Sequence, residues 1–163
     1  MKLRKDSLIR CGLVTSIVLA STSFAQEKGK YSCSEADPQS ICNPANTCGS
    51  ISNPCTIDIK RTAASASITP SIPNIKSNSP FCVKSGTTTT WKSQAKDTGF
   101  LVDFGPSSPF ESGGAIIGGS DRARSAVAKK QGCYKFSVGA CVSGSTYGMC
   151  DSVDTELVVT AGN

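Results

Sequence analysis

The stretch FLVDFGPSSPF, residues 100–110, contains the pattern that decides the fold class. Phe100, Val102 and Phe104 occupy every second position, and Asp103 lies between the last two. A period of two places alternate side chains on opposite faces of a β-strand, and the Gly-Pro pair that follows ends the strand. We therefore expect a strand here with its apolar side chains in a core and Asp103 facing water.

The same alternation recurs along the chain after Thr56. The further expected strands cover residues 57–60, 81–84, 87–91, 126–128, 134–138 and 156–160. Segments rich in Gly, Pro and Ser separate these runs, and no long helical period interrupts them. Short strands at this spacing predict an all-β sandwich or barrel, and about 100 residues suffice for one such core. We assign this domain to residues 56–163.

The first 25 residues have the three parts of a secretory signal peptide. The basic residues that precede the apolar run are Lys2, Arg4, Lys5 and Arg10. The run Cys11–Ala20 is ten residues long, and Ser23 and Ala25 stand where a signal peptidase reads small side chains. Since a helical span needs about 20 apolar residues, we expect no stable membrane span. We predict cleavage after Ala25 and a secreted protein, extracellular or periplasmic.

Loss of residues 1–25 removes Cys11 and leaves an even number of cysteines. The eight that remain are the candidates for disulfides: Cys33, Cys42, Cys48, Cys55, Cys82, Cys133, Cys141 and Cys150. An exported chain of this size with eight cysteines is expected to form up to four disulfides. The alternative is a metal site, which the absence of His and of any Cys-x-x-Cys pair disfavours.

Only one disulfide pairing can be argued from position in the chain. Cys141 ends one expected strand and Cys150 precedes the next, and consecutive strands are usually neighbours. The connection of eight residues between them is rich in Gly and Ser and closes easily. The competing arrangement sends Cys141 or Cys150 to the cysteines of residues 26–55, and the other pairings stay open.

Residues 26–55 form a Cys-rich, polar segment that we call the N-terminal arm. Four cysteines lie within it, separated by Pro, Asn and Ser, and no helical or strand period is visible. A segment with so little apolar surface depends on disulfides for its shape. We expect it to pack on the main domain rather than to fold as a second one.

Charge and residue types exclude several classes of function. Removing four basic residues and Asp6 with the signal peptide leaves thirteen basic and eleven acidic residues, a net charge of +2. A nucleic-acid-binding protein would show a concentrated basic face, so we expect no nucleic acid partner. Without His there is no Ser-His-Asp or Cys-His arrangement, and we expect no enzyme, no catalytic residue and no cofactor.

The carboxylates are scattered along the sequence. Those considered as catalytic pairs are Asp103, Glu111, Asp151, Asp154 and Glu156. Asp151 and Asp154 are expected in a turn before the last strand, and Glu156 on the outer face of that strand. The pattern therefore does not predict the paired carboxylates that a glycosidase needs.

The order of the motifs resembles the cupredoxin-like β-sandwich, in its copper-free exported form. The segments that carry the resemblance are FCVKSGTTTTW (81–91), FLVDFGPSSPF (100–110), GCYKFSV (132–138) and DTELVV (154–159). The resemblance covers residues 56–160 and implies a Greek-key sandwich. A blue-copper site requires two His, so this chain cannot form one. Cys141 and Met149 stand where the resemblance implies copper-binding Cys and Met residues.

The leading functional hypothesis is an exported, non-enzymatic binding or structural module that contacts an unknown protein or surface ligand through its end loops. Tyr147 is the exposed loop aromatic considered for such a contact. One alternative is a Cu(I)- or other metal-handling protein that uses Cys141 and Met149. A second alternative is a disulfide-rich inhibitor that presents a rigid loop between close cysteines.

Overall fold

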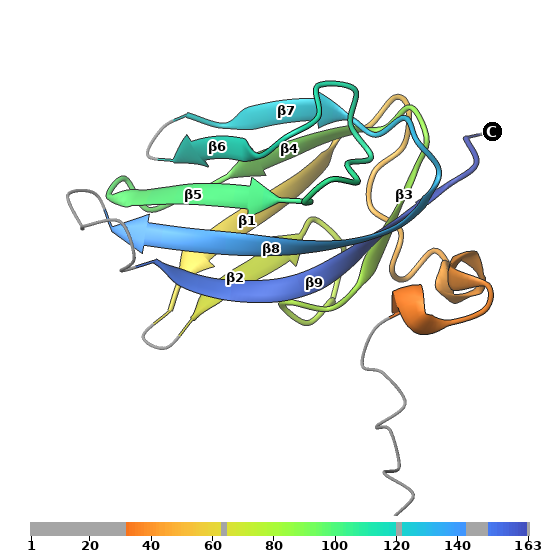
Figure 1. Cartoon of the computed structure of the whole chain (residues 1–163), viewed down its shortest axis with the longest axis horizontal. Helices are drawn as coiled ribbons and strands as arrows, with labels where there is room; N and C mark the ends of the chain where they lie inside the picture. Colours follow the sequence, from red (N-terminus) through yellow and green to blue (C-terminus); the bar gives the residue numbers. More distant parts are fainter. Residues whose placement is uncertain (1–31, 63–64, 120–121, 143–149, 163) are drawn as a thin grey trace, which may run out of the picture.

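The computed structural model describes residues 32–62, 65–119, 122–142 and 150–162. These residues form nine β-strands and two short 3-10 helices, without an α-helix (Figure 1). The all-β class expected from the alternation is therefore confirmed. No helix in the described part of the chain has the length and apolar character needed to cross a membrane. The predicted signal peptide, residues 1–25, lies outside the described residues.

Two mixed sheets pack face to face as a sandwich. The four-stranded sheet has the order β2 (Ala66–Pro70), β1 (Cys55–Arg61), β4 (Thr88–Lys92) and β7 (Arg124–Val127). The five-stranded sheet has the order β3 (Phe81–Lys84), β9 (Asp151–Thr160), β8 (Gly132–Val142), β5 (Thr98–Asp103) and β6 (Ile116–Gly119). Within each sheet one pair is parallel, β1 with β4 and β3 with β9, and the others are antiparallel.

The core lies between the two sheets and follows the alternation read from the sequence. Ile57 and Ile59 of β1 are fully buried, and Phe100, Val102 and Phe104 are at most 4 % exposed. Trp91 of β4 lies edge-on to Phe104, Phe110 and Phe136, which gather the two sheets around one aromatic cluster. The buried indole donates its N–H to Thr89 Oγ1 at 3.0 Å, so the only polar atom of the Trp91 side chain has a partner.

The described part of the N-terminal arm covers the outer face of the five-stranded sheet at one end. The two 3-10 helices, η1 (Ser32–Ser34) and η2 (Pro38–Ile41), contact β8 and β9. Disulfides hold them there: Cys33 is bonded to Cys133 of β8, and Cys42 to Cys82 of β3. The arm ends inside the sandwich, because Cys55 is already the first residue of β1.

The last strand corrects the turn expected at Asp151 and Asp154 and agrees with the position expected for Glu156. Asp151 and Asp154 do not form a turn, because β9 begins at Asp151 and pairs with β8 from Ala140 onward. Glu156 does lie on the outer face of β9, since its neighbours Leu157 and Thr155 face the core side, but it is fully buried. The reason is the arm: Cys33 lies over Glu156 and removes it from water.

Candidate binding trough

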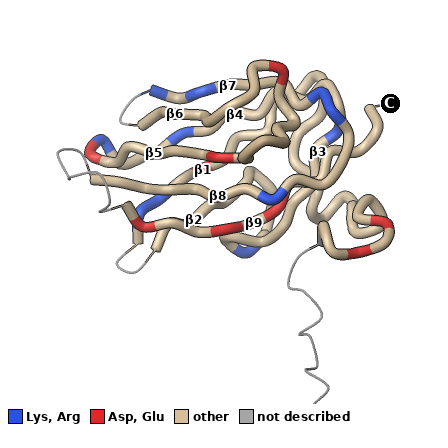
Figure 2. Tube along the Cα trace, in the orientation of Figure 1, with Lys and Arg blue, Asp and Glu red and all other residues tan. Residues whose placement is uncertain are grey.

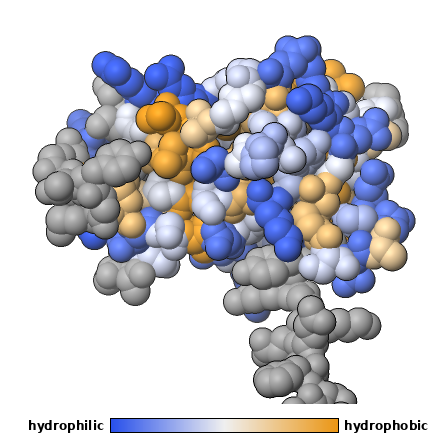
Figure 3. Space-filling model, viewed as in Figure 1, coloured by the Kyte–Doolittle hydropathy of each residue, from blue (hydrophilic) through white to orange (hydrophobic). Residues whose placement is uncertain are grey.

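The outer face of the five-stranded sheet changes character along its strands. At the end covered by the N-terminal arm it is closed, and at the other end β5, β6 and β8 are open. There a hollow with a volume of about 510 Å³ lies on the sheet, which we call the apolar trough. Its lining comprises Gly99, Phe100, Leu101, Asp103, Ile117, Gly118, Ser137, Gly139, Cys141, Cys150 and Ser152. Figure 3 shows hydrophobic surface gathered over β5, β6 and β8.

The floor of the apolar trough is made by two glycines that the backbone does not require. Gly99 of β5 and Gly139 of β8 lie between core-facing residues, so a side chain at either position would point outward. A Cβ at Gly139 would have its nearest contact at 3.9 Å, with Cys150 Cβ, and one at Gly99 would have 3.8 Å to the Gly118 carbonyl oxygen. Neither glycine has a positive φ. Missing side chains, and not backbone geometry, therefore open the trough.

A third glycine in the lining has a different role. A Cβ on Gly118 of β6 would lie 2.4 Å from the ring of Phe100 and 2.7 Å from the Arg122 carbonyl oxygen. Gly118 is thus needed for the close approach of β6 to β5. The fold therefore requires glycine at position 118, whereas Gly99 and Gly139 only leave space on the surface.

Apolar side chains form one wall of the trough and a disulfide forms the other. Ile117 of β6 and Leu101 of β5 are paired in register, and Ile117 is 64 % exposed. On the opposite side the Cys141–Cys150 disulfide joins the ends of β8 and β9. Large exposed aliphatic side chains are costly in water, so this surface favours contact with an apolar group.

A hollow of about 400 Å³, which we call the acidic hollow, adjoins the trough and shares Asp103 and Ser137 with it. Its ionisable lining residues are Asp103, Asp154 and Lys135. In register, Ser137 of β8 stands between Asp103 of β5 and Asp154 of β9. The Ser137 hydroxyl donates to Asp154 Oδ1 at 2.5 Å, while Asp103 Oδ1 accepts the Gly105 N–H at 2.8 Å. Figure 2 shows acidic positions along β5 and β9 and a basic position along β8. The basic residue of β8 is Lys135, which is paired in register with Glu156.

The edge of the sheet beside the trough is closed to an added strand. Gly119 exchanges backbone hydrogen bonds with Arg122, and the Nε of Arg124 donates to the Ile117 carbonyl oxygen at 2.8 Å. An arginine on an edge carbonyl is a common protection against strand pairing. A ligand at this end of the molecule is therefore expected on the face of the sheet.

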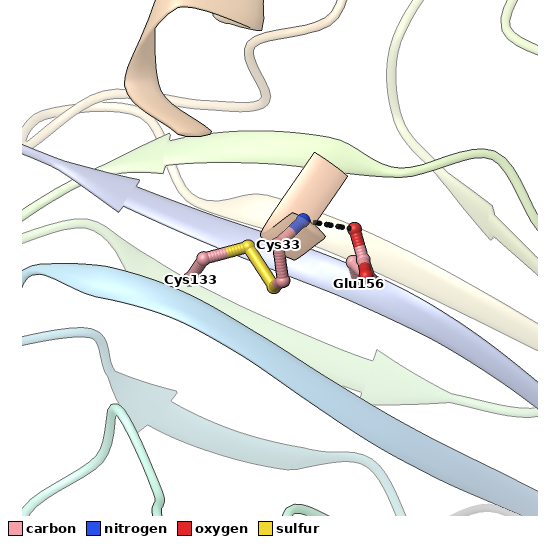
Figure 4. Close-up of side chains that lie close together, drawn as sticks. All are labelled: Cys33, Cys133 and Glu156. Carbon is pink, nitrogen blue, oxygen red and sulfur yellow. Dashed lines mark hydrogen bonds between the residues drawn. A yellow bond between two sulfur atoms is a disulfide. The ribbon is translucent and has the colours of Figure 1, made fainter. Parts of the chain in front are cut away.

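One group of possible metal ligands lies elsewhere, under the N-terminal arm. The Sγ atoms of Cys33 and Cys133 and a carboxylate oxygen of Glu156 lie within 4.8 Å of one another (Figure 4). The two sulfurs are joined as a disulfide, so they do not supply the thiolates that a metal ion needs. Glu156 Oε2 accepts the Cys33 N–H at 2.8 Å and fixes η1 on the sheet. We interpret the group as a structural attachment.

The disulfide candidates named from the sequence all pair. The four bonds are Cys33–Cys133, Cys42–Cys82, Cys48–Cys55 and Cys141–Cys150. The last is the local pair that the sequence favours, and it lines the trough. Because Cys141 is bonded, it offers no thiolate for the metal-handling alternative. Met149 and Tyr147, considered for copper and for a loop contact, lie outside the described residues.

A second exposed feature bears on the inhibitor alternative. The Cys48–Cys55 disulfide closes a short loop whose tip carries Ile51, 60 % exposed. Ser50 and Asn53 exchange backbone hydrogen bonds of 2.7 and 3.2 Å, so the chain reverses direction at Ile51. A disulfide closes the loop, as the alternative requires, but its tip is a tight turn rather than an extended segment.

No protein-family model and no curated protein sequence matches this chain.

Sequence reasoning missed the trough because it searched for side chains. The block of alternating residues at 134–138 continues as Gly139, Ala140 and Cys141, and a glycine in a strand interior is itself a signal of close approach or of missing surface. Read together with Gly99, it could have marked this face.

Proposed function

We propose that this chain is an exported, non-enzymatic binding module that holds an apolar group of a partner molecule in the apolar trough. The observation that carries the proposal is the pair Gly99 and Gly139. Glycine within a strand costs about 0.5–1 kcal/mol relative to alanine, and neither backbone position demands it. A cost in stability that opens a hollow between exposed aliphatic walls is typical of a surface kept for binding.

The surroundings of the trough support binding rather than catalysis. Among the described residues that line it, Asp103 is the sole ionisable group, and the rest are glycines, aliphatic and aromatic side chains, serines and a disulfide. These groups offer apolar contact and hydrogen bonds, and they provide no nucleophile–base pair. The four disulfides indicate an oxidising compartment and support the proposed export.

The proposal also includes the type of β-sandwich. We propose a copper-free, cupredoxin-like Greek-key sandwich, which the sequence resemblance and the two packed sheets support. The tight turn at Ile51 disfavours the inhibitor alternative, since proteases bind their substrates as extended segments. For the metal-handling alternative, the expected result is no free thiol and no Cu(I) bound by the oxidised mature protein.

The test is binding of the neutral apolar dye N-phenyl-1-naphthylamine, followed by its fluorescence. Ile117→Ser and Leu101→Ser each remove part of the apolar wall of the trough and should weaken dye binding about fivefold, because a partly buried branched side chain contributes about 1 kcal/mol. Val127→Ser is the matched control, since Val127 is also exposed but lies on β7, away from the trough.

Two results would contradict the proposal. One is the absence of dye binding to the folded protein. The other is an equal loss of binding in Val127→Ser, which would mean that the dye adsorbs to exposed apolar residues in general.

A further inference from the structure

The apolar trough and the acidic hollow form one continuous surface with a regular spacing. Three rows of outward-facing residues cross β5 and β8: Gly99 beside Cys141, Leu101 beside Gly139, and Asp103 beside Ser137. Successive rows are two residues apart along the strands, which is about 6.8 Å. The first two rows are apolar and the third is acidic.

We propose that the occupant of this surface is an extended polypeptide segment that carries an apolar residue and, two positions away, a lysine or arginine. This inference rests on the proposed function. In an extended chain, residues i and i+2 point to the same side and are also about 6.8 Å apart. Such a segment, aligned with β8, places its apolar side chain over Gly139 and its cation over Ser137.

Charge complementarity favours a cation at the third row. Asp103 and Asp154 are exposed and flank Ser137 on neighbouring strands, about 10 Å apart at their Cα atoms. Each uses Oδ1 for an internal hydrogen bond, to Gly105 N–H and to the Ser137 hydroxyl respectively. A guanidinium or ammonium group between the two carboxylates is attracted by both. Lys135, in the row beyond, also lines the hollow, so the third row places two carboxylates beside one ammonium group.

The floor and the edge explain why the segment lies on the face. At Gly139 a peptide can approach the sheet without meeting a side chain, because the nearest side-chain atom to a Cβ there is 3.9 Å away. Pairing along β6 is blocked by Arg124, whose Nε occupies the outward carbonyl of Ile117. Affinity therefore comes from side-chain contacts in the trough and from the acidic row, and we expect it to fall with ionic strength.

The test uses two acetylated, amidated pentapeptides, Ser-Leu-Ser-Arg-Ser and Ser-Leu-Ser-Glu-Ser, titrated into the mature oxidised protein and followed by amide chemical shifts. We expect the arginine peptide to bind and to shift residues of β5 and β8, and the glutamate peptide to bind at least fivefold more weakly. Asp103→Asn and Asp154→Asn should each weaken the arginine peptide about twofold to fivefold, because both pairs are exposed. Asparagine retains Oδ1, so the two internal hydrogen bonds can persist.

Asp58→Asn is the matched control, since Asp58 lies on the opposite sheet and its loss changes net charge equally. Equal binding of the two peptides, or equal weakening by Asp58→Asn, would overturn the inference. Binding of decyltrimethylammonium without binding of the arginine peptide would also overturn it and identify a small amphiphilic cation as the ligand. In that case the proposed function stands and the peptide inference fails. The same holds if neither the arginine peptide nor decyltrimethylammonium binds while dye binding is still weakened by Ile117→Ser and Leu101→Ser.

Discussion

Replacing Gly139 by valine should make the protein more stable and less able to bind. In β8 the new side chain points outward, and its Cβ meets no atom closer than ordinary contact, since Cys150 Cβ lies 3.9 Å away. Removing a strand glycine gains about 0.5–1 kcal/mol, and valine adds part of a β-propensity scale that spans about 1 kcal/mol. We therefore expect about 1 kcal/mol of added stability.

The three side-chain carbon atoms of the new valine occupy the floor of the apolar trough. A ligand displaced from the floor loses the burial of about two methylene groups, or about 1.6 kcal/mol, which corresponds to binding more than tenfold weaker. The assay is a thermal melt paired with dye titration on one preparation. For a domain of this size 1 kcal/mol raises the melting midpoint by about 3–5 °C.

Gly118→Ala is the matched control, because its Cβ would lie 2.4 Å from the Phe100 ring. It should lower the melting midpoint although it adds only one carbon atom at the same trough. A Gly139→Val protein that melts below the wild type, or that binds the dye with unchanged affinity, would refute the reasoning about the floor.

The remaining predictions concern export, disulfides and one tyrosine. Intact-mass analysis of the secreted protein should give Gln26 as its first residue, and retention of residues 1–25 would refute the signal peptide. Replacing Cys33 and Cys133 by serine should lower the free energy of unfolding by about 4 kcal/mol, because with Cys42–Cys82 intact this bond closes a loop of about 60 residues. Loss of Cys141–Cys150, with a sequence separation of nine, should lower it by about 2.6 kcal/mol. The reverse order in urea melts would contradict loop closure as the cause. Burial raises the pKa of Tyr134, whose hydroxyl donates to the Lys130 and Gln131 carbonyls, so its contribution to stability is complete below pH 10 and is lost as pH rises through the folded pKa. Absorbance titration at 295 nm should show a late ionisation step that Tyr134→Phe removes, and its persistence in that variant would assign the step elsewhere.

The alternation of apolar residues was sufficient to predict most of the strands that form the core. Phe100, Val102 and Phe104 face inward and Asp103 faces water, as expected. Two strands were not predicted, because their apolar residues form no long alternation: β2 turns only Ala66 and Ile68 inward, and β6 is two isoleucines followed by two glycines. Their strand state depends on pairing with β1 and β5, which a local pattern does not contain.

The buried state of Glu156 and the position of the trough depend on contacts between distant parts of the chain. Glu156 alternates correctly with the core, yet the Cys33–Cys133 bond, with a sequence separation of 100, brings the cover that buries it. The trough likewise requires Ile117, Leu101 and Gly139 to meet across three strands. None of these residues marks a binding surface by itself, because the apolar surface forms only when the strand order of the sheet brings them together.

The attachment of the N-terminal arm also determines how the five-stranded sheet ends. Cys48 donates its N–H to the Cys82 carbonyl and Cys82 donates to the Asn46 carbonyl, both at 2.8 Å, so the arm acts as a guard strand on the β3 edge. With Arg124 on the β6 edge, both sides of the sheet are occupied. Reduction of the Cys42–Cys82 bond would weaken the attachment of the guard strand to this edge, which the Cys33–Cys133 bond and the two backbone hydrogen bonds would still hold. The Cys42–Cys82 disulfide thus helps to protect the β3 edge of this sheet from pairing with another chain.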